Sequence, residues 1–204
     1  VMVRGERDPA SGSAWSFVAL PDLAATQIFG YWVDGFGQTF TLYRNTEYPC
    51  DPCNVDFLMA TLADGASSWN TQVVQPGKWG DPNDQFVESA SLAFDSQGNA
   101  IIAAHFTRRA ITGSYQSTEM RLYGVVNADW CDETVITQTD GYRGSDGYAF
   151  TGADPHLVVD DQDRYHLVFR DQAVWHDGQG WSNEMRGQVR YAVRVGGQWH
   201  VRTA

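Results

Sequence analysis

The chain has 204 residues, of which 43% are hydrophobic and 13% aromatic, a composition typical of a packed globular protein rather than a disordered one. Its formal net charge is −11 and its 14 basic residues are dispersed, which argues against a nucleic-acid partner. No apolar run approaches the roughly 18 residues needed to cross a bilayer, so no membrane span is predicted.

The first group of predicted strands contains residues typical of a turn between its first two strands. Val, Thr, Phe, Tyr and Trp are frequent in these runs, while no window spaces its apolar residues by three and four as a helix does. Asp34 and Gly37 lie in the turn that joins the first two strands. The expected strands are residues 27–33, 38–44, 55–62 and 69–74.

The same arrangement returns twice further along the chain. Asp34, Asp95 and Asp160 align at spacings of 61 and 65 residues, and Trp69, Trp130 and Trp199 align in the second half of each copy. The second copy is expected to contain strands at 88–94, 100–106, 119–126 and 130–137. The third is expected to contain strands at 153–159, 164–170, 188–195 and 199–204.

A hairpin turn explains the aligned aspartates without any catalytic role. An aspartate at the head of a turn accepts hydrogen bonds from backbone N–H groups two residues on, and Gly37 or Gly98 supplies the positive φ angle that the hairpin needs. The aligned tryptophans begin outer strands, where a large ring can cover the blade edge and pack against the next blade. Both sets are therefore interpreted as structural.

Three copies of a four-stranded unit predict an all-β fold of the β-propeller class, because each copy forms one antiparallel blade. The predicted blades span about 27–74, 88–137 and 153–204, within a single unit that covers residues 1–204. Propellers close with four to eight blades. Three blades therefore indicate a fragment of a longer propeller or a half that pairs with another chain, and further blades are expected from the same or another chain.

The third copy, PHLVVDDQDRYHLVFRD followed by VRYAVRVGGQW, resembles the blade repeats of bacterial extracellular β-propeller proteins. The resemblance covers residues 27–204 and implies a propeller located outside the cell or at its surface. It also implies a lectin-like, adhesin-like or sugar-active role. The chain departs from the family pattern at Ala104, where the repeats have an aromatic residue, and its first two copies lack the family's histidine.

The connections between strands fall into a short set and a long set, which we expect on opposite faces of the propeller. The long set comprises residues 45–54, 75–87, 107–118, 138–152 and 171–187. Long structured loops on a rigid scaffold are the usual place for binding and catalysis. Aromatic rings within them can stack on sugars, although single rings can also anchor a loop to its blade. The candidate ligand-binding residues are Tyr48, Trp79, Tyr115, Tyr142, Tyr148, Trp175 and Trp181, with Phe86 in the same loops.

These loops predict a binding module that recognises a glycan or a protein partner. Similar loops on every blade can build a binding face together, whereas catalysis requires one blade to deviate. A third interpretation is a structural subunit that assembles through its open blade edges and binds no ligand.

A sugar-degrading enzyme is the alternative, because the third copy carries acidic residues and histidines near the same loops. Glycoside hydrolysis needs two carboxyl groups, and a polysaccharide lyase needs a base and an acid. The candidate catalytic residues are Asp154, Asp171 and His176, with His105, His156, His166, Tyr142, Tyr148 and Arg170 as further acid–base or charge-neutralising groups. A blade-start turn with Pro155 on the strand edge is the favoured explanation of Asp154, and packing is the favoured role of His166.

Cysteine spacing gives a weak metal signal. Cys50 and Cys53 have the spacing of a metal half-site or a redox pair, but Cys131 is predicted to begin an outer strand near the opposite face. A local disulfide or two thiols is the expected state of the pair. Neither a metal nor a cofactor is predicted.

Overall fold

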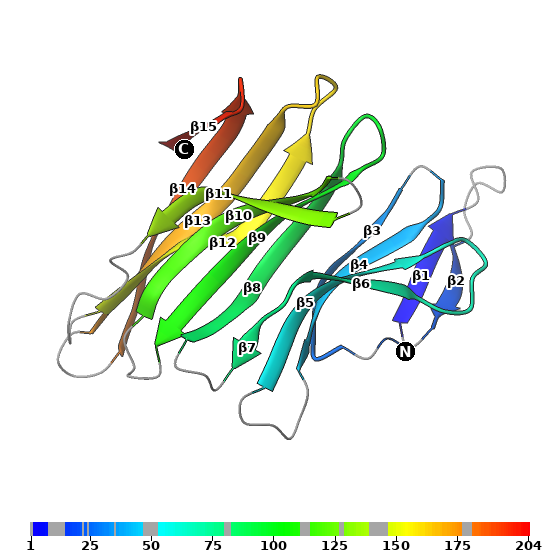
Figure 1. Cartoon of the computed structure of the whole chain (residues 1–204), viewed down its shortest axis with the longest axis horizontal. Coiled ribbons are helices and arrows are strands. Elements are labelled where there is room, and N and C mark those ends of the chain that lie inside the picture. The colour runs from blue at the N-terminus through cyan, green and yellow to red at the C-terminus, as the bar shows by residue number, and fades with distance from the viewer. Residues whose placement is uncertain are drawn as a thin grey trace.

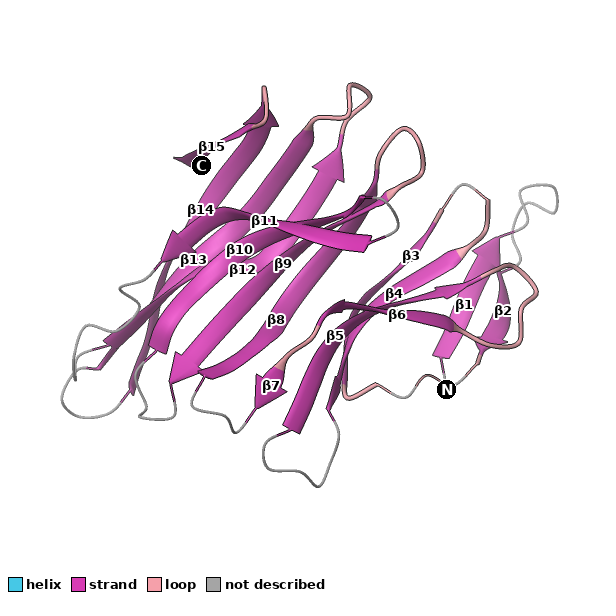
Figure 2. Ribbon diagram, viewed as in Figure 1, coloured by secondary structure: helices cyan, strands magenta, loops and turns pink. Residues whose placement is uncertain are grey.

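The computed structural model describes residues 2–7, 15–21, 23, 25–34, 36–46, 53–79, 83–110, 115–126, 129–138, 147–176 and 181–204. Every regular element in these segments is a strand (Figures 1 and 2). Among these residues, no helix has the length and apolar character needed to cross a membrane. The strands are β1 (Met2–Arg7), β2 (Trp15–Leu20), β3 (Gln27–Val33), β4 (Thr39–Thr46), β5 (Cys53–Leu62), β6 (Asn70–Gln75), β7 (Lys78–Trp79), β8 (Asn83–Phe94), β9 (Ala100–Ala110), β10 (Tyr115–Val126), β11 (Asp129–Gln138), β12 (Gly147–Val159), β13 (Tyr165–His176), β14 (Trp181–Val195) and β15 (Gln198–Thr203).

Twelve of these strands form three four-stranded antiparallel sheets, each built from consecutive strands. The first sheet contains β3 to β6, the second β8 to β11 and the third β12 to β15. The short strand β7 pairs with both β5 and β8 and so links the first two sheets. The hairpin of β1 and β2 lies on the far side of the first sheet from the second (Figure 1). The all-β class and the three four-stranded sheets are confirmed, whereas closure into a propeller stays a prediction.

The three sheets are stacked, and a hydrophobic core fills each of the two spaces between them. The first core joins Leu42 and Phe57 of the first sheet to Ile102 and Phe106 of the second. The second core joins residues of the second sheet such as Met120 to Leu167 and Phe169 of the third. The second sheet is therefore the middle layer, with a core on each of its faces.

Hydrophobic patterning along the strands explains this order of layers. In β9, residues 101–107 are all buried, which suits a strand covered on both faces. In β13 the buried Leu167 and Phe169 alternate with the exposed Val168, which suits a strand covered on one face only. The change from a continuous to an alternating pattern thus separates the middle sheet from an outer one.

Several strands extend into segments that the sequence predicts as long loops. The predicted loop 107–118 is occupied by the end of β9 and the start of β10, and the predicted loop 171–187 by the end of β13 and the start of β14. These two predictions of loop length are therefore wrong. The segments contain Thr, Tyr, Trp and Val, which favour strands, so the backbone pairing of each hairpin continues into the predicted loop.

Gly77 allows the close approach of strands at the junction between the first two sheets. Its carbonyl accepts a hydrogen bond from the Val55 N–H at 3.0 Å. A Cβ atom at this position would lie 2.3 Å from the carbonyl oxygen of Val55 and 2.8 Å from that of Gln85. Both obstacles are backbone atoms, so an added methyl group can be accommodated only if the strands move apart.

Gly77→Ala is therefore expected to lower the free energy of unfolding by about 1–3 kcal/mol, as overpacking does. Gly124→Ala is the matched control, because its Cβ would meet Ile101 at an ordinary 3.8 Å, and we expect a change within about 0.5 kcal/mol. Urea denaturation followed by tryptophan fluorescence measures both values. Equal losses for the two variants would contradict this account of the junction.

Candidate functional site

The three aligned aspartates occupy equivalent turns, one at the end of the first strand in each sheet. Each accepts two backbone hydrogen bonds at its Oδ1 atom, from the residues two and four positions on. Gly37 and Gly98 have φ angles of 80° and 81°, as the turn requires. The structural interpretation of Asp34, Asp95 and Asp160 is confirmed.

In the third turn, Asp163 replaces the glycine and keeps the left-handed conformation with a φ angle of 55°. Its carboxylate accepts hydrogen bonds from the Ser96 N–H at 2.7 Å and the Ser96 hydroxyl at 2.6 Å. These bonds lower the pKa of Asp163. Asp163 adopts a positive φ angle less readily than glycine would. In return, its carboxylate links the turn of the third sheet to the turn of the second.

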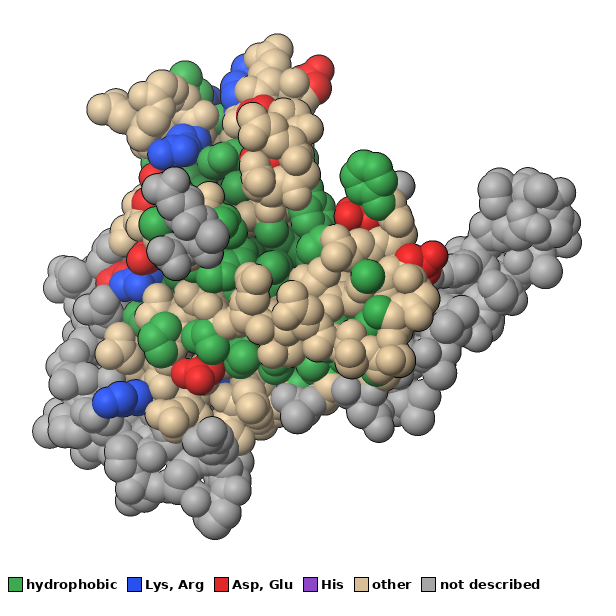
Figure 3. Space-filling view, turned by 45° about the vertical axis from the view of Figure 1, so that its right-hand side comes forward, with side chains coloured by type: hydrophobic (Ala, Val, Ile, Leu, Met, Phe, Trp, Pro, Cys, Tyr) green, Lys and Arg blue, Asp and Glu red, His purple; other side chains and the backbone are tan. Residues whose placement is uncertain are grey.

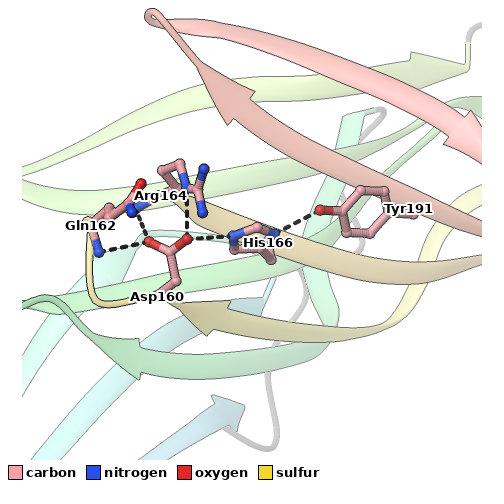
Figure 4. A network of polar contacts seen from close by, with 5 residues as sticks. All are labelled: Asp160, Gln162, Arg164, His166 and Tyr191. Atoms are coloured by element: carbon pink, nitrogen blue, oxygen red, sulfur yellow. Dashed lines mark hydrogen bonds and ion pairs between the residues drawn. The ribbon is translucent and has the colours of Figure 1, made fainter.

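Asp160 is also the centre of a polar network (Figure 4). Its second oxygen accepts a hydrogen bond from Arg164 Nε at 2.7 Å and lies 3.0 Å from His166 Nε2. The other ring nitrogen of His166 lies 2.7 Å from the hydroxyl of Tyr191. The hydrogen bond from His166, with those from Arg164 and Gln162, lowers the pKa of Asp160 well below its ordinary value. His166 is thereby held in the third sheet by Asp160 and Tyr191.

Two of the aligned tryptophans donate hydrogen bonds to residues that precede their own sheet in the chain. Trp199 Nε1 donates to Glu133 of the second sheet at 3.1 Å, and Trp69 Nε1 donates to the carbonyl of Pro21 at 3.0 Å. Trp130 is packed against the first hydrophobic core. Trp130 and Trp199 thus pack at an interface between sheets, but the neighbouring sheet there precedes their own and is not the next one.

A cleft of about 300 Å³ lies between the second and third sheets, at the end where the short turns gather. Ile101, Leu122 and Val125 supply an apolar strip from the second sheet. Tyr165 and Arg194 lie across from them on the third sheet, and the remaining lining residues are polar or small: Asp95, Asn99, Gly124, Cys131, Asp132 and Glu133. The volume is at the lower end of the roughly 300–1,000 Å³ typical of ligand pockets.

Glu133 and Arg194 form the polar centre of this cleft. Arg194 donates to Glu133 at 2.9 Å, and its guanidinium lies 5.7 Å from the centre of the Tyr165 ring. Burial raises the pKa of Tyr165, so its hydroxyl stays protonated. Figure 3 shows one side of the molecule, on which hydrophobic side chains lie together near the middle and charged side chains lie around them. A ligand with one apolar face and several hydroxyl groups suits such a lining.

A second, more open hollow of about 570 Å³ lies on the far side of the first sheet. Tyr43 and Leu58 form part of its lining with Trp69, and Asn45 and Thr71 add polar groups. Tyr43 is buried, and this burial raises the pKa of its hydroxyl. A hydrogen bond with Thr71 lowers the same pKa by a smaller amount. This hollow therefore combines aromatic, aliphatic and hydroxyl groups on an outer layer of the stack.

The seven predicted ligand-binding aromatic residues remain a prediction. Tyr48 and Tyr142 lie outside the described residues. The other five lie on strands, but their side chains are outside what the structure describes: Trp79, Tyr115, Tyr148, Trp175 and Trp181. Phe86, from the same predicted loops, is buried against Val55 and has a packing role.

Strand register brings four of the predicted site residues to one end of the third sheet. Trp175 is paired with both Gly147 and Ser182, and Tyr148 is paired with Val174. His176 is paired with Trp181 on the adjacent strand. This end of the sheet lies opposite the turn that contains Asp160, so the predicted aromatic cluster and the cleft at Glu133 and Arg194 are at opposite ends of the stack.

The two predicted catalytic aspartates each bind an arginine. Asp154 has a positive φ angle of 50° and forms an ion pair with Arg170, and its backbone N–H donates a hydrogen bond to the Ser89 hydroxyl oxygen at 3.2 Å. Asp171 accepts hydrogen bonds from Thr151 at 2.6 Å and from Arg190 at 2.7 Å. The catalytic interpretation of Asp154, Asp171 and His176 stays a prediction.

Strand register places the two arginine partners on different faces of the third sheet. Arg190 is paired with Phe169, which faces the second core, whereas Arg170 is paired with the exposed Val189. The two carboxylates are thus stabilised by cations from opposite faces. A shared acid–base pair would need both groups to reach one substrate.

His105 lies inside the molecule, on the face of β9 that it shares with Ile101 and Ala103. It is 5% exposed. Burial lowers its pKa from 6.5 to about 4, and the charge of Asp154 acts in the opposite direction. His105 is therefore neutral at physiological pH.

The cysteines provide no metal site in the part of the chain that the structure covers. Cys131 is an exposed free thiol in the cleft, Cys50 lies outside the described residues, and the backbone of Cys53 is paired with Trp79. The described His, Cys, Asp and Glu side chains form no group of three or more that could hold a metal ion.

Comparison with known proteins does not assign a family. No family model matches the chain, and no curated protein matches it. Among solved structures, a fucose lectin from Kordia zhangzhouensis in complex with methyl-fucoside is similar at a TM-score of 0.41 and 13% identity. The similarity covers 84% of this chain and 95% of that chain.

Sequence reasoning missed the residues of the cleft, since they come from turns and strands that meet only in the folded stack. Glu133 and Arg194 lie 61 positions apart in the chain. The sequence contained one indication. Trp130 and Trp199 align at the start of predicted outer strands, and Glu133 follows Trp130 on the same outer strand.

Proposed function

We propose that this protein is a non-enzymatic carbohydrate-binding module that holds a sugar in the cleft between its second and third sheets. The observation that carries the proposal is the convergence of Glu133, Arg194 and Tyr165 beside the apolar strip of Ile101, Leu122 and Val125. Carboxylate and guanidinium groups bond sugar hydroxyls, while an aromatic ring and aliphatic groups cover the C–H face of the ring.

The polar groups of the cleft are already ordered before any ligand arrives. Glu133 receives hydrogen bonds from both Arg194 and Trp199, which fix the direction of its carboxylate. Fixed donors and acceptors reduce the entropy that binding costs. This order favours recognition of a small hydroxyl-rich ligand over non-specific adhesion.

The aromatic cluster predicted at the opposite end, which includes Trp175 and Trp181, is the second candidate site for the same function. Its support is the strand register that gathers Tyr148, Trp175, His176 and Trp181 at one end of the third sheet. A protein ligand is the alternative partner there. An extracellular or cell-surface location is part of the proposal, and it rests on the repeat resemblance.

A glycan array followed by calorimetric titration of the best-binding glycan tests the proposal. Arg194→Met is expected to weaken binding by about 10- to 100-fold, because it removes charged hydrogen bonds that are each worth about 1.5–3 kcal/mol. Arg164→Met is the matched control, since Arg164 belongs to an exposed pair outside the cleft, and we expect its affinity to equal that of the wild type.

Three other outcomes have clear meanings. Loss of binding in Trp175→Ala with none in Arg194→Met would move the site to the aromatic cluster. Binding to no glycan at all would reject the carbohydrate proposal. New reducing ends or unsaturated uronates, lost in Asp154→Asn, would establish the enzyme instead of the binding module.

A further inference from the structure

Two short hydrogen bonds join the turn of the third sheet to the turn of the second. The Asp163 carboxylate accepts one from the Ser96 N–H at 2.7 Å and one from the Ser96 hydroxyl at 2.6 Å. Distances this short are typical of hydrogen bonds to an ionised acceptor, which are stronger than those between neutral groups. We call this pair of bonds the turn clasp.

The turn clasp is present although the backbone of Asp163 is unfavourable for an aspartate. Its φ angle is 55°, in a region where the aligned residues of the other turns are Gly37 and Gly98. Glycine adopts this conformation without steric cost, whereas a residue with a Cβ atom does not. A strained residue that is held in place by bonds around it is more typical of a functional site than of an ordinary turn.

The turn clasp lies beside the cleft between the second and third sheets. Asp95 and Tyr165 line this cleft, and they are one and two residues away from the two partners of the clasp. On the edge strand β11 of the second sheet, Glu133 accepts hydrogen bonds from Arg194 and Trp199 of the third. The two walls of the cleft are therefore joined near the turns by the clasp and at the edge strand by Glu133.

The interface between the first and second sheets is built differently at the same place. The positions aligned with the clasp partners are Gly35 and Gly98, which have no side chain to form such a link. Phe40 and Phe94 pack there instead, with their ring centres 4.7 Å apart. At the second interface the aligned positions hold Ile101 and a valine, which are smaller and leave room for the cleft. The clasp thus occurs where packed rings do not hold the two turns in place.

We propose that Asp163 and Ser96 are positioning residues, whose clasp keeps the walls of the cleft at the separation that a bound sugar requires. This inference rests on the proposed sugar binding in the cleft. With the clasp in place, Tyr165 and Arg194 stay at a fixed distance from the apolar strip on the second sheet. A cleft of fixed width loses less entropy when it binds a ligand than one that has to close around it.

The sheets are also held together away from the turns, so loss of the clasp is expected to act locally. The Leu157 N–H of the third sheet donates to the Ser91 hydroxyl of the second at 3.1 Å. Leu157 also lies in the second hydrophobic core, together with Leu167 and Phe169. None of these contacts involves the turns. The effect of the clasp on binding can therefore be separated from its effect on stability.

Asp163→Gly removes the clasp and keeps a backbone that suits the positive φ angle. Calorimetric titration is expected to show about 10-fold weaker binding of the best-binding glycan. The melting temperature is expected to stay within about 3 °C of the wild type, because relief of the strained backbone offsets the lost bonds. Ser96→Ala removes the hydroxyl bond alone, so its loss of affinity is expected to be smaller, about threefold. It provides the same test if Asp163→Gly does not fold.

Two variants of the same turn distinguish the hydrogen bonds from the charge. Asp163→Asn keeps an acceptor oxygen and a residue type that tolerates positive φ angles, so it is expected to bind within about threefold of the wild type. Asp161→Asn removes a charge from an exposed neighbour in the turn, and its affinity is expected to equal that of the wild type. Equal losses in Asp163→Gly and Asp161→Asn would show that charge alone acts on the cleft and would overturn the proposal.

The indole N–H of Trp199 reports on the cleft without any sugar, because it donates to Glu133 across the same two sheets. Its hydrogen exchange, followed by NMR, is expected to be at least about threefold faster in Asp163→Gly and unchanged in Asp161→Asn. Faster exchange in a protein that binds no glycan would reject the sugar proposal and leave the clasp standing. Unchanged exchange in Asp163→Gly would overturn the clasp, and so would unchanged affinity in that variant where the wild type binds.

Discussion

Arg121→Ala is expected to lower the free energy of unfolding by about 3–5 kcal/mol, the cost of leaving one charge of a buried ion pair uncompensated. Arg121 and Glu119 are each only 10% exposed in their side chains, and their charged atoms lie 2.7 Å apart. The guanidinium also stacks 4.1 Å from the centre of the Phe106 ring and lies 3.2 Å from Asp132. Removal of the arginine would therefore leave the Glu119 carboxylate buried without its main cation.

Two comparisons separate this explanation from general damage to the core. The double variant Glu119→Leu with Arg121→Met removes both charges, and we expect it to recover most of the lost stability, since apolar groups replace buried pairs well. Arg164→Ala breaks a pair in which the arginine is 49% exposed, and the expected loss is below about 1 kcal/mol. Chemical denaturation gives all three values. Similar losses for Arg121→Ala and Arg164→Ala would show that burial does not govern the pair.

The repeat in the sequence predicts the sheets because a short-range pattern fixes them. The turns at Asp34, Asp95 and Asp160 depend on hydrogen bonds within five residues, so the sequence alone contains the whole motif. The ends of β9 and β13 depend instead on how long the neighbouring strand continues to pair, and that is set by tertiary context. The hairpin of β1 and β2 has no counterpart in the repeats and was not predicted.

The candidate site could be predicted less well than the sheets. Its cleft arises where Glu133 of one sheet meets Tyr165 and Arg194 of another, and stacking distance is not written in any local pattern. The buried ion pair of Arg121 and Glu119 could be predicted better than the cleft, because residues two positions apart on a strand lie on the same face. Two opposite charges on a face that also carries the buried Tyr123 indicate a buried pair.

The stability of the protein is expected to fall by about 3 kcal/mol between pH 6.5 and pH 4 because of His105 alone. Its pKa is lowered from 6.5 to about 4 in the folded state, chiefly by burial. Below pH 6.5 the unfolded chain binds a proton that the folded chain excludes, so acid favours unfolding. The loss begins near pH 6.5 and levels off near pH 4, where the folded histidine is protonated as well.

His105→Gln isolates this contribution, because glutamine is polar and does not titrate. The difference in unfolding free energy between wild type and variant, measured by denaturation at several pH values from 7 to 4, is expected to shift by about 3 kcal/mol in favour of the variant as the pH falls. Asp154→Asn removes the charge that raises the pKa of His105, so the levelling-off should move to lower pH. A pH-independent difference between wild type and His105→Gln would show that His105 is not kept neutral by its buried position.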